Sequence, residues 1–121
     1  MLLYIHVPFC FSKCDYCGFY SIVPQETYFV DRYLDHLEKN MDRWFNKLTP
    51  TSKEIKTVFV GGGNPTMLGL KGIRRIIAML HDHMDMEHLE EITFETNPET
   101  LTEDIAAFFA VKVAFFVLIY F

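Results

Sequence analysis

The sequence lacks an excess of positive charge. Its 11 Lys and Arg residues are outnumbered by 16 Asp and Glu residues, which gives a formal net charge of −5 at pH 7. Domains that bind nucleic acid usually carry a basic patch, so we expect no nucleic-acid partner. The first residues, Met1 to His6, also lack the basic region and the long apolar stretch of a signal peptide. We therefore expect a protein that is not exported.

The sequence also lacks an apolar run long enough to span a membrane as a helix. The most apolar stretch covers residues 105–121, where Lys112 is the only charged residue. A spanning helix needs roughly 20 consecutive apolar residues, so we do not expect a membrane anchor. The stretch can instead be a buried strand or helix end, or an aberrant terminus.

Cysteines are scarce, and their grouping is the most informative feature of the chain. All three lie within eight positions, as Cys10, Cys14 and Cys17. Three thiols cannot all pair as disulfides, and three thiolates leave a tetrahedral metal site one ligand short. The set suits a [4Fe–4S] cluster in which thiolates bind three irons and the fourth stays open to a small molecule. A structural zinc site with His6 as fourth ligand is the alternative. Clustered unpaired cysteines without an export signal indicate the reducing cytoplasm.

Hydrophobic periodicity predicts strands that alternate with helices. We expect strands over residues 2–7, 57–60 and 92–95, and helices over residues 26–47, 70–84 and from Thr102 onward. The apolar stripe of the first helix includes Trp44, which we place in the core. Such alternation predicts right-handed βαβ units around a parallel sheet.

The chemically informative residues follow the ends of these predicted strands. The cysteines follow the first strand, three glycines follow the second, and Glu95 ends the third. In parallel α/β folds, ligands bind beyond the carboxyl ends of the strands. We therefore expect all three groups to lie on one rim of the sheet.

Three segments around these positions resemble the radical S-adenosylmethionine (SAM) enzymes. They are Tyr-Ile-His-Val-Pro-Phe at 4–9, Gly-Gly-Gly-Asn-Pro-Thr at 61–66 and Glu-Thr-Asn-Pro at 95–98. The resemblance is to the oxygen-independent coproporphyrinogen III oxidase group and its haem-chaperone relatives, and it extends from about Leu2 to about Ala110. It implies an α/β fold, the N-terminal half of a parallel partial (β/α) barrel of the TIM type. We expect residues 1–110 to form a partial radical SAM domain, followed by an aberrant or truncated apolar tail at residues 111–121.

The resemblance also implies roles for individual residues. Cys10, Cys14 and Cys17 would hold a [4Fe–4S] cluster whose open iron binds SAM. The cofactor-binding residues would be Tyr4, Tyr16, Gly61, Gly62, Gly63, Asn64 and Glu95. Tyr16 would pack near the adenine, the glycines would receive the methionine part of SAM, and Glu95 would hold a ribose hydroxyl or the amino group. Tyr4 and His6 are candidates for proton delivery or substrate contact.

Several of these positions also have a structural interpretation. The glycines are equally typical of a tight strand-to-helix turn, and Tyr4 and His6 can be packed in a barrel interior. Asn64 stands where most members of the family carry Thr, and it keeps the capacity to hydrogen-bond.

The position two residues after the third cysteine bears on the branch of the family. The oxidases often carry a fourth cysteine there, whereas this chain has Phe19. The difference favours the haem-chaperone branch, with haem or a porphyrin as ligand and a protein as electron donor. Because the chain matches only the first part of a family member, we do not expect full turnover from it, and its status as an enzyme stays open. A non-catalytic module with zinc or iron–sulfur, or an inactive remnant, are the alternatives.

Overall fold

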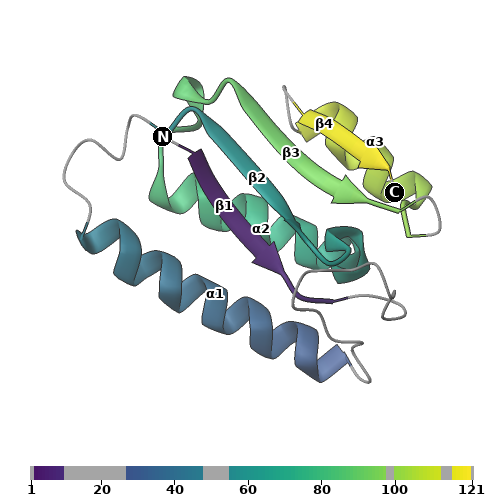
Figure 1. Cartoon of the computed structure of the whole chain (residues 1–121), viewed down its shortest axis with the longest axis horizontal. Helices are drawn as coiled ribbons and strands as arrows, with labels where there is room; N and C mark the ends of the chain where they lie inside the picture. Colours follow the sequence, from purple (N-terminus) through teal and green to yellow (C-terminus); the bar gives the residue numbers. More distant parts are fainter. Residues whose placement is uncertain (1, 10–26, 48–54, 98–99, 113–115, 121) are drawn as a thin grey trace.

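The computed structural model describes residues 2–9, 27–47, 55–97, 100–112 and 116–120. Within these ranges, four strands form one sheet in the order β1-β2-β3-β4, and each neighbouring pair is parallel. The strands are β1 (Leu2–Val7), β2 (Thr57–Gly62), β3 (Glu91–Thr96) and β4 (Phe116–Tyr120). The predicted α/β class with a parallel sheet is therefore confirmed (Figure 1).

Three helices connect the strands in the described part of the chain. They are α1 (Thr27–Lys47), α2 (Gly69–His83) and α3 (Glu103–Lys112), and the short 3-10 turns η2 (Pro65–Leu68) and η3 (Met86–His88) flank α2. In Figure 1, α2 runs behind the sheet and α1 runs along the β1 side. The helix starts and ends agree with the periodicity, and Thr102 immediately precedes α3, as predicted.

One face of the sheet forms the core with the helices. Successive side chains of a strand point to opposite faces, so every second residue of β1, β2 and β3 faces the helices. These residues are buried together with helix residues in one cluster, which includes Ile5, Val7, Val58, Val60, Ile92, Phe94, Leu34, Met41, Ile73, Ile76, Leu80, Ile105 and Phe109. The alternate strand positions, Tyr4, His6, Phe59 and Glu95, therefore share the opposite face.

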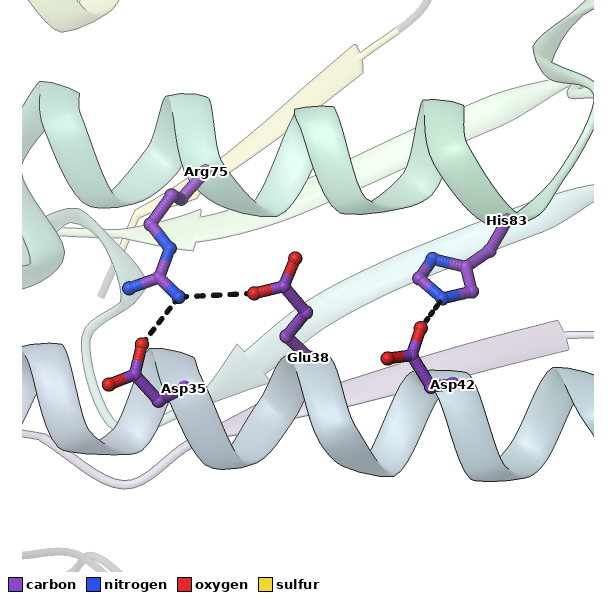
Figure 2. A network of polar contacts seen from close by, with 5 residues as sticks. All are labelled: Asp35, Glu38, Asp42, Arg75 and His83. Atoms are coloured by element: carbon purple, nitrogen blue, oxygen red, sulfur yellow. Dashed lines mark hydrogen bonds and ion pairs between the residues drawn. The ribbon is translucent and has the colours of Figure 1, made fainter.

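Helices α1 and α2 are joined by apolar and polar contacts. Leu34 reaches α2 at Gly72, where an added Cβ would lie 3.5 Å from the Leu34 Cδ1 atom. Arg75 Nη2 lies 2.7 Å from Asp35 Oδ1 and 3.3 Å from Glu38 Oε2 (Figure 2). Exposed ion pairs contribute about 0.2–1 kcal/mol each, so the buried apolar contacts supply most of the attachment.

The prediction that Trp44 lies in the core is wrong, because its side chain is 55% exposed. Met41 and Phe45, four residues apart, lie on the same face of α1 and pack into or against the core. Trp44 lies seven residues after Leu37 and so shares the apolar stripe by spacing, but the packing of α1 leaves its side chain uncovered.

The apolar stretch at the end of the chain contributes to the sheet. Helix α3 continues through residue 112, and β4 pairs in parallel with β3, with Ile92 opposite Phe116 and Thr96 opposite Tyr120. Among the described residues, no helix combines the length and apolar character needed to cross a membrane. The predicted domain boundary at residue 110 stays a prediction.

Candidate functional site

The carboxyl ends of β1, β2 and β3 form one rim, where a group of polar side chains gathers on the sheet face opposite the core. The register pairs His6 with Gly61 and Val7 with Gly62, so the ends of β1 and β2 lie level. Tyr4, His6, Gly61, Gly62 and Glu95 come together there, as the sequence pattern predicts. Cys10, Cys14, Tyr16 and Cys17 lie outside the described residues.

Two glycines leave room for the side chains of neighbouring strands. A Cβ added at Gly61 would lie 2.5 Å from Glu95 Oε1, so the Glu95 carboxylate lies directly over this glycine. A Cβ at Gly62 would lie 2.5 Å from Nδ1 and Cε1 of His6, and Gly62 has φ +108°, a conformation that side chains rarely adopt. Both positions therefore require glycine for close approach, and Gly62 requires it for its backbone as well.

The imidazole of His6 lies between a phenol and the glycine turn. Tyr4 Oη and His6 Nδ1 are 3.0 Å apart, and the Tyr4 ring stacks on Phe59 at a centroid distance of 5.9 Å. Tyr4 is 46% exposed, whereas His6 is half-buried. The phenol and the imidazole are therefore linked by a hydrogen bond at the rim.

Glu95 is a buried carboxylate at the end of β3, with 9% of its surface exposed. Burial raises the pKa of Glu95 above its ordinary value, while the Gly62 N–H that donates to the carboxylate and the charge of His6 partly oppose that rise. The pKa of Tyr4 is raised by its own burial and then by Glu95. A carboxylate in this setting stabilises a ligand that brings positive charge or hydroxyl donors, because a buried charge needs a partner.

The segment that leads into the first cysteine is held from two sides. The Gly63 N–H donates to the Val7 carbonyl at 2.7 Å, and the Asn64 N–H donates to the Phe9 carbonyl at 2.6 Å. From α1, the Tyr33 hydroxyl donates to the His6 carbonyl. The backbone of residues 6–9 is therefore held both by α1 and by the turn after β2.

The Asn64 side chain belongs to a second, buried polar cluster. Its Oδ1 can only accept, so the Thr66 hydroxyl donates to it at 2.7 Å. Thr66 then accepts from Thr100 at 2.6 Å and from Thr96 at 2.9 Å, and Thr100 accepts from Asn64 Nδ2 at 2.8 Å. Asn64, Thr66 and Thr100 thus form a closed ring of hydrogen bonds that joins the turn after β2 to the turn after β3.

Sequence reasoning missed Tyr33, Thr66 and Thr100 as supports of the rim. Thr66 lies in the 61–66 segment, but nothing in the spacing indicates that its partners lie at positions 96 and 100. Tyr33 falls in the apolar stripe of α1, where it looks like an ordinary core residue.

No group of three or more His, Cys, Asp or Glu side chains in the described ranges could hold a metal ion. The rim has the features of a site for a small molecule with an amino or hydroxyl group, because it presents a buried carboxylate beside a hydrogen-bonded phenol and imidazole. The buried Glu95 carboxylate suits the ammonium or ribose hydroxyls of SAM, and three thiols suit an iron–sulfur cluster.

The chain is similar to a protein-family model and to several known proteins. The model of the radical SAM superfamily matches residues 4–118. Proteins called "Heme chaperone HemW" are similar to the chain. That of Buchnera aphidicola from Schizaphis graminum is 36% identical over 99 residues, 82% of this chain and 26% of that protein. That of Escherichia coli is 33% identical over 102 residues, 84% of this chain and 26% of that protein.

A solved structure has the same fold. The coproporphyrinogen III oxidase HemN of Escherichia coli, described as a radical SAM enzyme, superposes with a TM-score of 0.78 at 27% identity. The match covers 97% of this chain and 27% of the oxidase. The chain thus spans about a quarter of the length of its relatives.

Proposed function

This chain belongs to the radical SAM superfamily, and we propose that it binds a [4Fe–4S] cluster through Cys10, Cys14 and Cys17 and SAM at the adjoining rim. The observation that carries the proposal is the position of Glu95. Its buried carboxylate lies over Gly61 and accepts from the Gly62 N–H, at the edge where the cysteine segment begins. The three-cysteine spacing adds ligands for a cluster with one open iron.

When both groups are bound, the cluster supplies the electron that cleaves a carbon–sulfur bond of SAM. The chain supplies position and electrostatics. Glu95 accepts hydrogen bonds from the SAM amino group or a ribose hydroxyl. The methionine part lies along the turn of Gly61, Gly62 and Gly63, beside the Glu95 and His6 side chains that cover the first two glycines. Tyr16, which lies outside the described residues, is proposed to pack near the adenine, and Asn64 holds the turn that carries the glycines.

Tyr4 and His6 hold a proton at the same rim. The hydroxyl of Tyr4 and Nδ1 of His6 are 3.0 Å apart, so a proton can pass between the exposed phenol and the half-buried imidazole. We propose that the pair contacts the substrate or delivers a proton to it.

For the protein as a whole, we propose the haem-chaperone branch, with haem as a ligand and a protein as electron donor. The support is the similarity to HemW proteins and Phe19 in place of a fourth cysteine. We also propose a cytoplasmic location, because the three thiols must stay reduced to bind iron. Haem binding can be tested by addition of haem to the purified chain. A shifted Soret band is expected if this chain, which spans about a quarter of the length of its relatives, contributes to haem binding.

The decisive experiment is anaerobic reconstitution with iron and sulfide, followed by low-temperature EPR of the dithionite-reduced protein with and without SAM. We expect about four irons per chain and a signal whose g-values change when SAM is added. The Glu95→Gln variant should keep the cluster and weaken the response to SAM, because the amide is a poorer partner for an ammonium group.

Two outcomes would overturn the proposal. Stoichiometric zinc in place of iron, with no cluster after reconstitution, would favour the structural metal module with His6 as fourth ligand. A cluster whose g-values do not change when SAM is added would favour an iron–sulfur module or an inactive remnant.

A further inference from the structure

Tyr33 on α1 lies far from the three motifs in sequence but contacts the rim directly. Its hydroxyl donates to the backbone carbonyl of His6. Its ring meets the ring of Phe9 edge to face, with centroids 5.4 Å apart at 79°. Phe9 is 1% exposed, so this ring contact is part of the core.

The contact of Tyr33 with His6 helps to hold the end of β1 between two other elements. Tyr33 holds the segment from α1, while Gly63 and Asn64 hold it from the turn after β2 through the carbonyls of Val7 and Phe9. We infer that Tyr33 is a positioning residue for the rim, which fixes residues 6–9 and through them the His6 imidazole. The inference rests on the proposed function, because the rim is taken to bind SAM beside the cluster.

The His6 side chain has little room to move. The His6 ring lies so close to Gly62 that an added Cβ would be 2.5 Å from two ring atoms, and Nδ1 must stay 3.0 Å from Tyr4 Oη. Displacement of the His6 backbone would move the ring away from Tyr4 or toward Gly62, and a hydrogen bond weakens as its geometry departs from the preferred range.

The hydroxyl of Tyr33 is well suited to act as a permanent hydrogen-bond donor. Burial, followed by the effect of Tyr4, holds the pKa of Tyr33 well above its ordinary value. The phenol therefore stays protonated at neutral pH. A phenylalanine at position 33 would keep the ring contact with Phe9 and lose only the bond to His6.

The test uses amide hydrogen exchange of the reduced chain without added iron, with exchange of residues 91–96 as internal reference. In Tyr33→Phe, the amides of His6, Val7 and Phe9 should exchange about three- to tenfold faster, which corresponds to the loss of one hydrogen bond. The Asp42→Asn variant is the matched control, because it removes the negative charge that α1 presents to His83 and changes nothing at the rim. It should leave exchange at residues 6–9 unchanged.

A second readout uses the loaded protein. Reconstituted Tyr33→Phe should bind iron as the wild type does but show a smaller change of EPR g-values on addition of SAM, and Asp42→Asn should respond normally. Tyr33→Leu, which also loses the ring contact, should exchange faster still. Unchanged exchange in Tyr33→Phe, or equal acceleration in Asp42→Asn, would overturn the inference. If the wild type takes up no cluster, the proposed function fails, while the exchange data still decide whether Tyr33 holds the rim.

Discussion

Replacement of Gly61 by alanine tests the relation between the glycine turn and Glu95. Gly61 is not one of the described glycines with positive φ, so alanine introduces no backbone strain there. Its Cβ would lie 2.5 Å from Glu95 Oε1, 3.0 Å from Glu95 Cδ and 2.5 Å from Phe59 Cε1. The carboxylate must therefore move, and the Phe59 ring, which is half-buried, can turn aside.

The magnitude follows from what the carboxylate loses when it moves. Glu95 accepts from the Gly62 N–H, and a hydrogen bond to a charged group contributes about 1.5–3 kcal/mol. Alanine stabilises by about 0.4–1 kcal/mol because it restricts the unfolded chain. The free energy of unfolding should therefore fall by about 1–2 kcal/mol. The pKa of Glu95, followed by NMR, should rise further as the donated hydrogen bond is lost.

Urea unfolding of a double-mutant cycle provides the assay. In a Glu95→Ala background the oxygen that blocks the new Cβ is gone, so Gly61→Ala should lower stability by less than about 0.5 kcal/mol. Gly69→Ala is the control, because Gly69 has φ +72° and no atom lies within 4 Å of its added Cβ. It should destabilise through backbone strain alone, to the same extent with or without Glu95. Additivity of Gly61→Ala and Glu95→Ala would refute the reasoning.

Two further measurements address contacts outside the rim. His83 Nε2 lies 2.5 Å from Asp42 Oδ1, as Figure 2 shows, and Nδ1 lies 2.6 Å from the Met79 carbonyl. Burial alone would lower the pKa of His83, but these acceptors raise it above 6.5. The stabilisation should be complete below pH 6.5 and be lost as pH rises through the raised value. Asp42→Asn should flatten that dependence in urea unfolding, and an unaltered profile would contradict the assignment. Thr66→Val should lower stability by about 1–3 kcal/mol in the same assay, because it removes the donor to the buried Asn64 Oδ1. Thr66→Ser should lose much less, and equal losses would show that the hydroxyl is unimportant.

The sequence by itself determined the order of the elements and the place of the site. Strand and helix periods are local properties, so residues 2–7 and 57–60 could be recognised as strands without knowledge of their neighbours. Once the strands are parallel, topology alone brings their carboxyl ends to one edge. That is why the group of Tyr4, His6, Gly61 and Glu95 could be predicted.

Only the tertiary structure decided which side chains meet at that edge. The contact of Glu95 with Gly61 depends on the register between β2 and β3, and the bond from Tyr33 to His6 depends on how α1 packs beside β1. These pairs are 34 and 27 positions apart, and a local hydrophobic period does not say which two side chains touch across such a separation. The exposure of Trp44 has the same origin, because helical periodicity defines an apolar stripe, but packing decides how wide a part of it is covered.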